Sequence, residues 1–159
     1  MPVESVANSL DAARIAIENR VRARWTQPDL QLLTPVKFAD KAKLESAAGD
    51  VDREPDKSPW LKVDIIWGEA ETTSIGPEAQ NQVTGIVQLT LFYPKLFPNA
   101  PGGSGILQLV GKARSVFDNW FDDGLSFFAS SAPTRSDENN WKVAIIQTPF
   151  ELYECAANG

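Results

Sequence analysis

The 159-residue chain contains no histidine and only one cysteine, Cys155. The absence of histidine removes the commonest general base, the commonest proton switch near neutral pH and the commonest metal-binding side chain. A single cysteine forms neither an intramolecular disulfide nor a thiolate zinc cluster, and its scarcity suits a reducing compartment. These absences favour a protein that is not an enzyme and that binds no metal or other cofactor.

The chain also lacks a long apolar run and an excess of basic charge. No segment approaches the roughly 20 consecutive apolar residues of a membrane-spanning helix. Charged residues interrupt the stretch from Met1 to Val21, so we expect no signal peptide and no membrane association. The 21 acidic residues outnumber the 15 basic ones, for a net charge of −6. That sign argues against a dedicated nucleic-acid-binding domain, whereas the 43% hydrophobic content predicts a folded chain.

The first part of the chain divides into a helix and an arm. Apolar residues from Val6 to Trp25 recur at three- and four-residue spacings, which predicts an amphipathic helix over 5–25. Prolines interrupt residues 26–59. We expect an extended arm there, with a short edge strand between Leu30 and Phe38. So long a stretch without a strong element indicates an interaction surface.

The second part of the chain reads as a sheet with one helix. Residues 60–67 and 83–93 alternate apolar and polar side chains, as half-buried strands do. A second amphipathic helix is predicted over 105–122, followed by strands at 125–129 and 141–152. The whole chain, 1–159, is then one domain with a sheet–helix core over 60–154. We predict a two-layer α+β fold, in which one mixed sheet of about four strands carries two helices.

The connection from Gly68 to Gln82 is long for two strands that pair as a hairpin, which usually need 2–5 residues. It contains glutamates but no basic residue, and it has too little apolar surface to fold alone. We therefore predict an interaction loop that orders against a partner. Its candidate residues are Glu69, Glu71, Thr72, Thr73, Ile75, Glu78 and Gln80.

Other patterns do not reach the requirements of a chemical site. The glycine-rich run at 102–105 lacks the spacing of a phosphate-binding or dinucleotide-binding loop. The acidic stretch 50–56 lacks the central glycine and terminal glutamate of a calcium loop. Without histidine, no serine can belong to a Ser-His pair. We therefore predict no catalytic, cofactor-binding or metal-binding residue.

The tryptophans and arginines have structural explanations. Each of the five tryptophans lies on a predicted helix or strand, so we expect core or subunit-interface packing rather than stacking on single-stranded nucleic acid. Arg20, Arg22 and Arg24 do not share one helix face. We therefore expect no concerted basic patch on the first helix.

Several short sequence segments follow one another in the order of the predicted helices and strands. "PWLKVDIIWGEAE" forms the first clear strand, and "TGIVQLTLFYP" precedes the turn "GGSG". A helix ending in "VFDNWF" and a final "NWKVAIIQTPFELYE" complete the pattern. Over residues 1–154 this arrangement resembles the tail terminator and minor tail proteins of long-tailed bacteriophages, including a phage-related domain of unknown function.

The resemblance implies a structural virion protein that is assembled in the host cytoplasm. Such a subunit forms a homo-oligomeric ring, typically a hexamer, caps the tail tube and stops its polymerisation. The ring also offers a joining surface to a neck or connector protein, and DNA passes through it without specific binding. No catalysis and no cofactor is implied. A net-negative subunit is compatible with this role because it repels the phosphates of passing DNA.

Two other functions stay open at the level of sequence. A head–tail connector or neck subunit belongs to the same machinery and would have a similar composition. A small-ligand-binding or enzymatic α+β domain belongs to a different class, but no convergent set of polar residues supports it. Six-fold rings of the purified protein would favour a tail terminator or a connector subunit. A compact monomer with a bound ligand would favour the ligand-binding or enzymatic domain.

Overall fold

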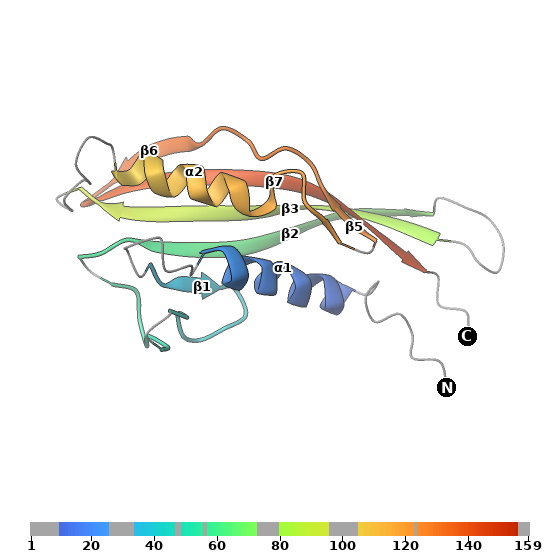
Figure 1. The fold of residues 1–159 in the computed structure, drawn as a ribbon, viewed down its shortest axis with the longest axis horizontal. Helices are drawn as coiled ribbons and strands as arrows, with labels where there is room; N and C mark the ends of the chain where they lie inside the picture. The colour runs from blue at the N-terminus through green and yellow to red at the C-terminus, as the bar shows by residue number, and fades with distance from the viewer. Residues whose placement is uncertain are drawn as a thin grey trace.

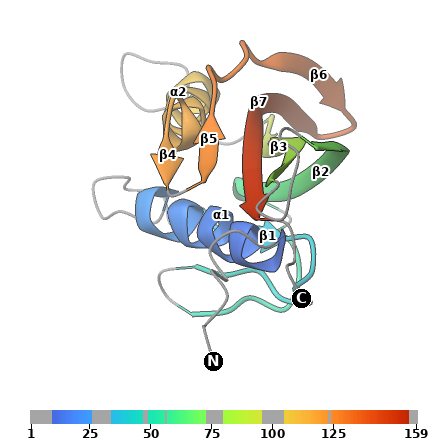
Figure 2. The same ribbon diagram turned by 90° about the vertical axis from the view of Figure 1, so that its right-hand side faces the viewer.

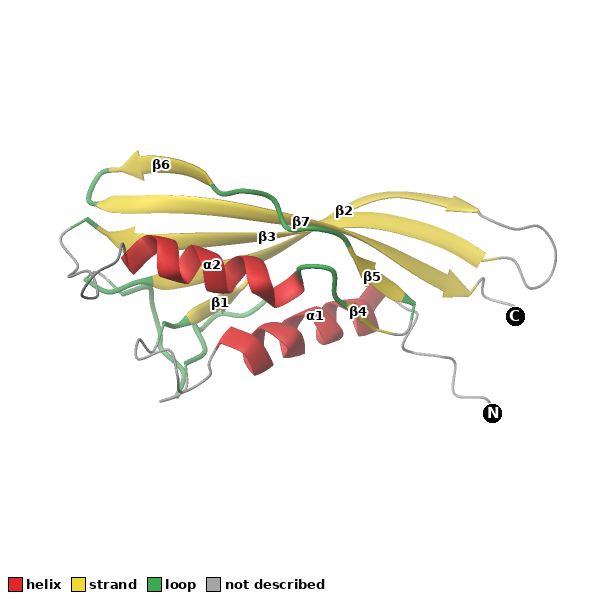
Figure 3. Ribbon diagram, turned by 45° about the horizontal axis from the view of Figure 1, so that its top comes forward, coloured by secondary structure: helices red, strands yellow, loops and turns green. Residues whose placement is uncertain are grey.

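A computed structural model of the protein describes residues 10–25, 34–46, 49–55, 57–72, 80–95, 105–122 and 124–155. Figure 1 shows the elements, which in chain order are α1 (Leu10–Trp25), β1 (Val36–Phe38), β2 (Trp60–Thr72), β3 (Gln80–Pro94), α2 (Gly105–Phe117), β4 (Phe121–Asp122), β5 (Leu125–Phe127), β6 (Thr134–Glu138) and β7 (Trp141–Cys155). Both helices lie on the same side of one sheet (Figures 2 and 3). The predicted α+β class is confirmed.

The sheet is larger than the sequence predicts. Its described strands run in the order β1-β2-β3-β7-β5-β4, and β6 pairs with the first part of β7. β1 is parallel to β2 and the other pairs are antiparallel, so the sheet is mixed. The prediction of about four strands is wrong, because the sheet has seven. β5 lies within the strand predicted at 125–129, whereas β4 is too short to show a period and every residue of β6 is exposed, so these two strands leave no hydrophobic alternation in the sequence.

The two helices bury most of the stripes that the sequence predicts, but Leu10 is 45% exposed, and Phe121 lies on β4 and is 77% exposed. In α1 the buried apolar residues are Ala13, Ile17, Val21 and Trp25, and residues 5–9 of the predicted helix lie outside the described residues. α2 ends at Phe117 instead of residue 122. Asn119 adopts a positive φ of 54° directly after the helix, and this left-handed conformation terminates it. No helix in the described part of the chain is long and apolar enough to span a bilayer.

One hydrophobic core lies between the helices and the sheet. β3 supplies alternate residues from Val83 to Tyr93, and β7 supplies Ala144, Ile146, Phe150 and Leu152. The register pairs Leu89 with Ile146 and Val63, so the three long strands present their apolar side chains to the same face. Arg20 of α1 donates a hydrogen bond from Nε to the carbonyl oxygen of Val116 in α2, 2.8 Å away, and so ties the helices together.

The predicted extended arm is instead folded against the core over its described part. Val36 to Phe38 form β1, and Val36 also exchanges backbone hydrogen bonds with Glu45 on its other side. Leu44, in the middle of the arm, is 1% exposed. The arm packs because its few apolar side chains reach the edge of the sheet, a long-range contact that no local period reports. Residues 26–33 lie outside the described part.

Candidate interaction surfaces

The ends of three strands form a ribbon that extends past the helices (Figure 1). We call this part the distal ribbon: residues 67–72 of β2, 80–85 of β3 and 150–155 of β7. The register pairs Glu71 with Gln82, and Asn81 with both Thr72 and Glu154, so β3 runs between the other two strands. Val83, Phe150 and Leu152 at its base belong to the hydrophobic core, and the rest of the ribbon continues past the helices (Figure 1).

The predicted interaction loop is largely strand. Glu69, Glu71 and Thr72 belong to β2, and Gln80 belongs to β3. The prediction of a fifteen-residue connection is therefore wrong, because the strands continue to Thr72 and resume at Gln80. Thr73, Ile75 and Glu78 lie outside the described residues. The error arises because Gly68 to Ala70 are all exposed, and a strand without a buried face shows no alternation.

The distal ribbon carries acidic charge only. No lysine or arginine occurs between Lys62 and Lys95, and none follows Lys142. The described ribbon contains Glu69, Glu71, Glu151 and Glu154. One sign of charge on β2 and β7 creates a negative potential that repels phosphate and attracts basic groups.

A cross-strand row of Trp67, Gly85 and Phe150 supports the base of the ribbon. Gly85 pairs with Trp67 on β2 and with Phe150 on β7. The Phe150 ring is fully buried, lies over Gly85 and meets the Trp67 ring edge-on at a centroid distance of 5.6 Å. The glycine thus leaves the space that the phenylalanine ring occupies. The β2–β3 register shifts between Trp67 and Ala70, which marks a bulge where the ribbon begins.

A pocket of about 280 Å³ opens beside β2. It lies between α1, the turn after β1, and β2. Its lining includes two carboxylates and two aromatic rings among the residues Arg14, Glu18, Phe38, Asp40, Ile65 and Trp67. Trp67 is 38% exposed at this site. The pocket therefore combines an accessible indole with acidic groups.

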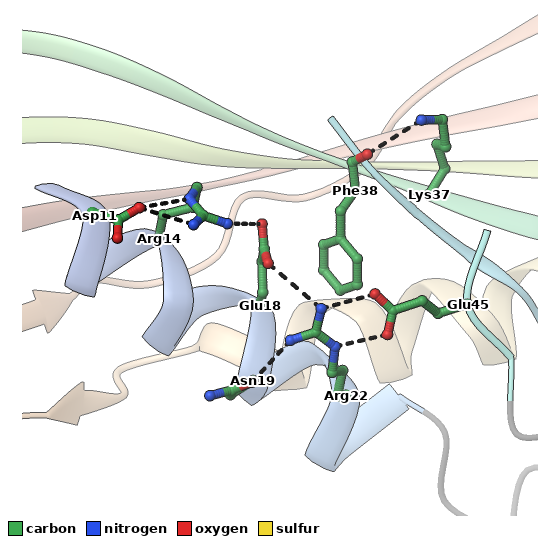
Figure 4. A network of polar contacts seen from close by, with 8 residues as sticks. All are labelled: Asp11, Arg14, Glu18, Asn19, Arg22, Lys37, Phe38 and Glu45. Carbon is green, nitrogen blue, oxygen red and sulfur yellow. Dashed lines mark hydrogen bonds and ion pairs between the residues drawn. The ribbon is translucent and has the colours of Figure 1, made fainter. Parts of the chain in front are cut away.

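The chain of ion pairs in Figure 4 runs from the pocket to the arm. Arg14 bonds Asp11 at 2.8 Å and the buried carboxylate of Glu18 at 3.0 Å. Arg22 lies 3.5 Å from Glu18 and grips both carboxylate oxygens of Glu45 at 2.8 Å. Glu18 is 5% exposed, and the two guanidiniums compensate the burial of its charge. The network joins α1 to the arm.

Hydrogen bonding shifts the pKa values of this network. The bond from Arg22 holds the pKa of the Glu45 carboxyl below its ordinary value, against the smaller opposing effect of burial. The same bond raises the pKa of Arg22. Hydrogen bonds to Asp11 and then to Glu18 raise the pKa of Arg14. All three groups are therefore stabilised in their charged forms at neutral pH.

The sequence predicts that Arg20, Arg22 and Arg24 of α1 do not form one basic patch, and the structure places them apart. Arg20 lies over the Trp120 ring at 4.8 Å and bonds the Val116 carbonyl. Arg22 bonds Glu45 in the arm, and Arg24 is exposed at the end of the helix.

A second concavity, of about 590 Å³, lies between α1 and β4. Small side chains of α1, Ala12, Ala16 and Ala23, form one wall, and Trp120 and Leu125 contribute to the other. Phe121 on the neighbouring strand β4 is 77% exposed. Asn19, Arg20 and Asp122 also line this concavity, so its surface mixes apolar and polar groups.

The tryptophans divide between core and surface. Trp25 is buried and donates its Nε1–H to the carbonyl oxygen of Thr34. Trp60 is 8% exposed and stacks on Phe92 at 4.2 Å, on the sheet face opposite the helices, and its Nε1 has no partner in the described part of the chain. Trp141 meets Phe92 edge-on at 6.2 Å. These contacts use the rings for packing.

The acidic stretch of the arm does not form a cluster in the described residues. Asp52 lies 3.4 Å from Lys43 at an exposed position, and Asp56 is outside the described part. Within the described ranges, no three acidic or cysteine side chains come close enough to hold a metal ion. The glycine run at 102–104 is likewise outside the described residues.

Comparison with known proteins identifies a similar fold but no function. No family model and no curated protein matches the chain. Eight chains among the solved structures match it. One of them shares 16% of its residues with this chain, with a TM-score of 0.56 over 91% of this chain and 95% of its own, and its name states no activity. At this level of identity the similarity establishes a common fold alone.

Proposed function

We propose that this chain is a tail terminator subunit of a long-tailed bacteriophage. In this proposal, copies of the chain form a ring, with six the expected number, that caps the tail tube and stops its polymerisation. The opposite side of the ring joins the tail to a neck or connector protein. The subunit is a structural component of the virion, assembled in the host cytoplasm, and has neither catalytic activity nor a cofactor.

The observation that carries the proposal is the acidic distal ribbon. The end of the ribbon, beyond the core residues Val83, Phe150 and Leu152, extends past the helices (Figure 1) and is suited to contact a neighbouring molecule. Its glutamates, including Glu69 and Glu151, have no basic residue beside them in the sequence of these strand ends. In a ring around DNA, such a ribbon keeps phosphates from binding and lets the duplex slide.

The decisive experiment deletes the gene from the phage that carries it and examines the resulting particles by electron microscopy. Loss of a terminator leaves tails of uncontrolled length, and the wild-type protein supplied in trans restores their length. Tails of normal length that fail to join heads would instead identify a connector subunit. Normal particles would refute both assignments.

A second variant tests the connection between β2 and β3, which the sequence predicts to be part of an interaction segment. We expect replacement of residues 73–79 by a short Gly-Ser turn to leave the melting temperature nearly unchanged, because the core residues lie elsewhere. The same variant should fail to restore tail length in the complementation assay. Six-fold rings of the purified wild-type protein would support the proposal, and a compact monomer with a bound small ligand would contradict it.

A further inference from the structure

The outer edge of β2 is open beyond the short strand β1. β1 pairs only Val36 to Phe38 with Leu61 to Val63, and the chain then turns away at Ala39 and Asp40. No other strand in the described ranges pairs with this side of β2. The edge from Asp64 to the bulge after Trp67 is therefore available to another strand.

The hydrogen-bonding groups of this edge point outward. Leu61 donates its N–H to the Pro35 carbonyl on the β1 side. In an antiparallel ladder, alternate residues direct both N–H and C=O to the same side. Ile65 and Trp67 share the phase of Leu61, so their backbone groups point to the side where β1 has ended. Such a row is a template for an added strand.

The same two residues line the pocket of about 280 Å³. A strand added along Ile65 and Trp67 would place one of its alternating side chains over this pocket, as in strand-addition complexes, where pockets give specificity. The pocket thus lies where an added strand needs a recognition site.

The chemistry of the pocket selects a basic side chain. The Trp67 ring lines the pocket and is 38% exposed, so part of its surface is open to a cation. Asp40, in the exposed turn after β1, supplies a carboxylate, whereas the two oxygens of Glu18 are already paired with Arg14 and Arg22. The pocket's own cation, Arg14, is already bonded to Asp11 and Glu18. The lining therefore holds one more negative than positive charge, and β2 beyond Lys62 adds only acidic residues.

The chain itself offers no matching edge in its described part. β6 contains Arg135 but also Asp137 and Glu138, and β4 contains Asp122. Pairing either strand with the acidic β2 edge of a second copy would bring like charges together, which destabilises a sheet. Nucleic acid is repelled by the same charge. The complementary occupant is a basic segment of a different protein.

We infer that the open edge of β2 binds an extended segment of another protein, with lysine or arginine at alternate positions, by strand addition. The backbone of the segment pairs with Ile65 and Trp67, and one basic side chain enters the pocket between Trp67 and Asp40. This inference concerns a binding edge and does not depend on the place of the protein in a phage tail.

Synthetic peptides test the inference on the full-length protein by calorimetric titration. The probe is an end-capped eight-residue peptide of alternating valine and arginine, and its control replaces arginine with glutamine. Two further peptides carry N-methyl groups on either the valine or the arginine nitrogens, so that only one of them blocks pairing with β2. We expect the arginine peptide to bind, the glutamine peptide to bind at least about tenfold more weakly, and one N-methyl peptide alone to lose binding.

Matched protein variants locate the site. Trp67→Leu removes the ring and Asp40→Asn removes an exposed charge. Each variant should weaken binding of the arginine peptide by up to roughly tenfold. Ile66→Ala, on the opposite face of the same strand, should leave binding unchanged. Melting curves show that each variant is folded, and Asp40→Asn, in an exposed turn, is informative even if Trp67→Leu is unstable.

Two results would overturn the inference. Equal binding of both N-methyl peptides and the parent peptide would mean adsorption by charge without strand pairing. No binding of the arginine peptide at about 1 mM would mean that the edge is not a binding site. Neither result bears on tail length in the phage assay, so the two proposals fail independently.

Discussion

Substitution of Gly85 by alanine should destabilise the protein through a single steric conflict. A Cβ atom at Gly85 would lie 2.5 Å from Cζ and 2.8 Å from Cε1 of Phe150, and 2.9 Å from the Ile66 carbonyl oxygen. The ring cannot move freely, because Phe150 is fully buried and packs against Trp67 and Phe127. Overpacking of this kind costs about 1–3 kcal/mol in the free energy of unfolding.

Part of this cost is offset in the unfolded state. Alanine has fewer unfolded conformations than glycine, which is worth about 0.4–1 kcal/mol where the native backbone accepts it. We therefore expect Gly85→Ala to lower the free energy of unfolding by about 1–2 kcal/mol. For a chain of this size the melting temperature should fall by roughly 2–8 °C.

Urea denaturation of four proteins measures the effect: the parent, Gly85→Ala, Phe150→Leu and the double variant. Leucine at position 150 leaves room for the new methyl group, so the double variant should be more stable than additivity predicts by about 1 kcal/mol. Gly111→Ala is the control, because Gly111 is an exposed residue inside α2 with no atom within 4 Å of an added Cβ. It should stabilise the protein by about 0.5–1 kcal/mol. Unchanged stability of Gly85→Ala, or strict additivity with Phe150→Leu, would refute the reasoning.

Three further predictions concern charge. Bonding to Arg22 depresses the pKa of Glu45 in the folded protein. The ionised Glu45 therefore contributes its full stabilisation above the ordinary pKa of 4.5, and this contribution is lost as the pH falls through the lower pKa of the folded state. Glu45→Gln should flatten that acid limb in pH-dependent urea titrations, and an unchanged limb would contradict the assignment. Leu89→Asp buries an unpaired charge at a fully buried position and should abolish cooperative melting. Calorimetry with calcium should show no stoichiometric micromolar binding, and a signal lost in Asp50→Ala/Asp52→Ala would reverse our interpretation of the arm.

Part of the candidate surface was predictable from residue order. The lack of basic residues between Lys62 and Lys95 marks the acidic ribbon in the sequence itself. The extent of its strands was not predictable, because Gly68 to Ala70 are exposed and show no alternation. The pocket was missed entirely. Arg14, Asp40 and Trp67 are far apart in the chain, and no spacing rule connects them.

The sequence by itself determined the two amphipathic helices, the three long strands and the α+β class. Those features follow from periodic burial of neighbouring residues, and a short window of sequence records that period. Only the tertiary structure decided that β1 runs parallel to β2, that the arm packs through Leu44, and that β4 and β6 extend the sheet. Those features depend on partners distant in the chain, and edge strands with exposed side chains carry no hydrophobic period that would reveal them.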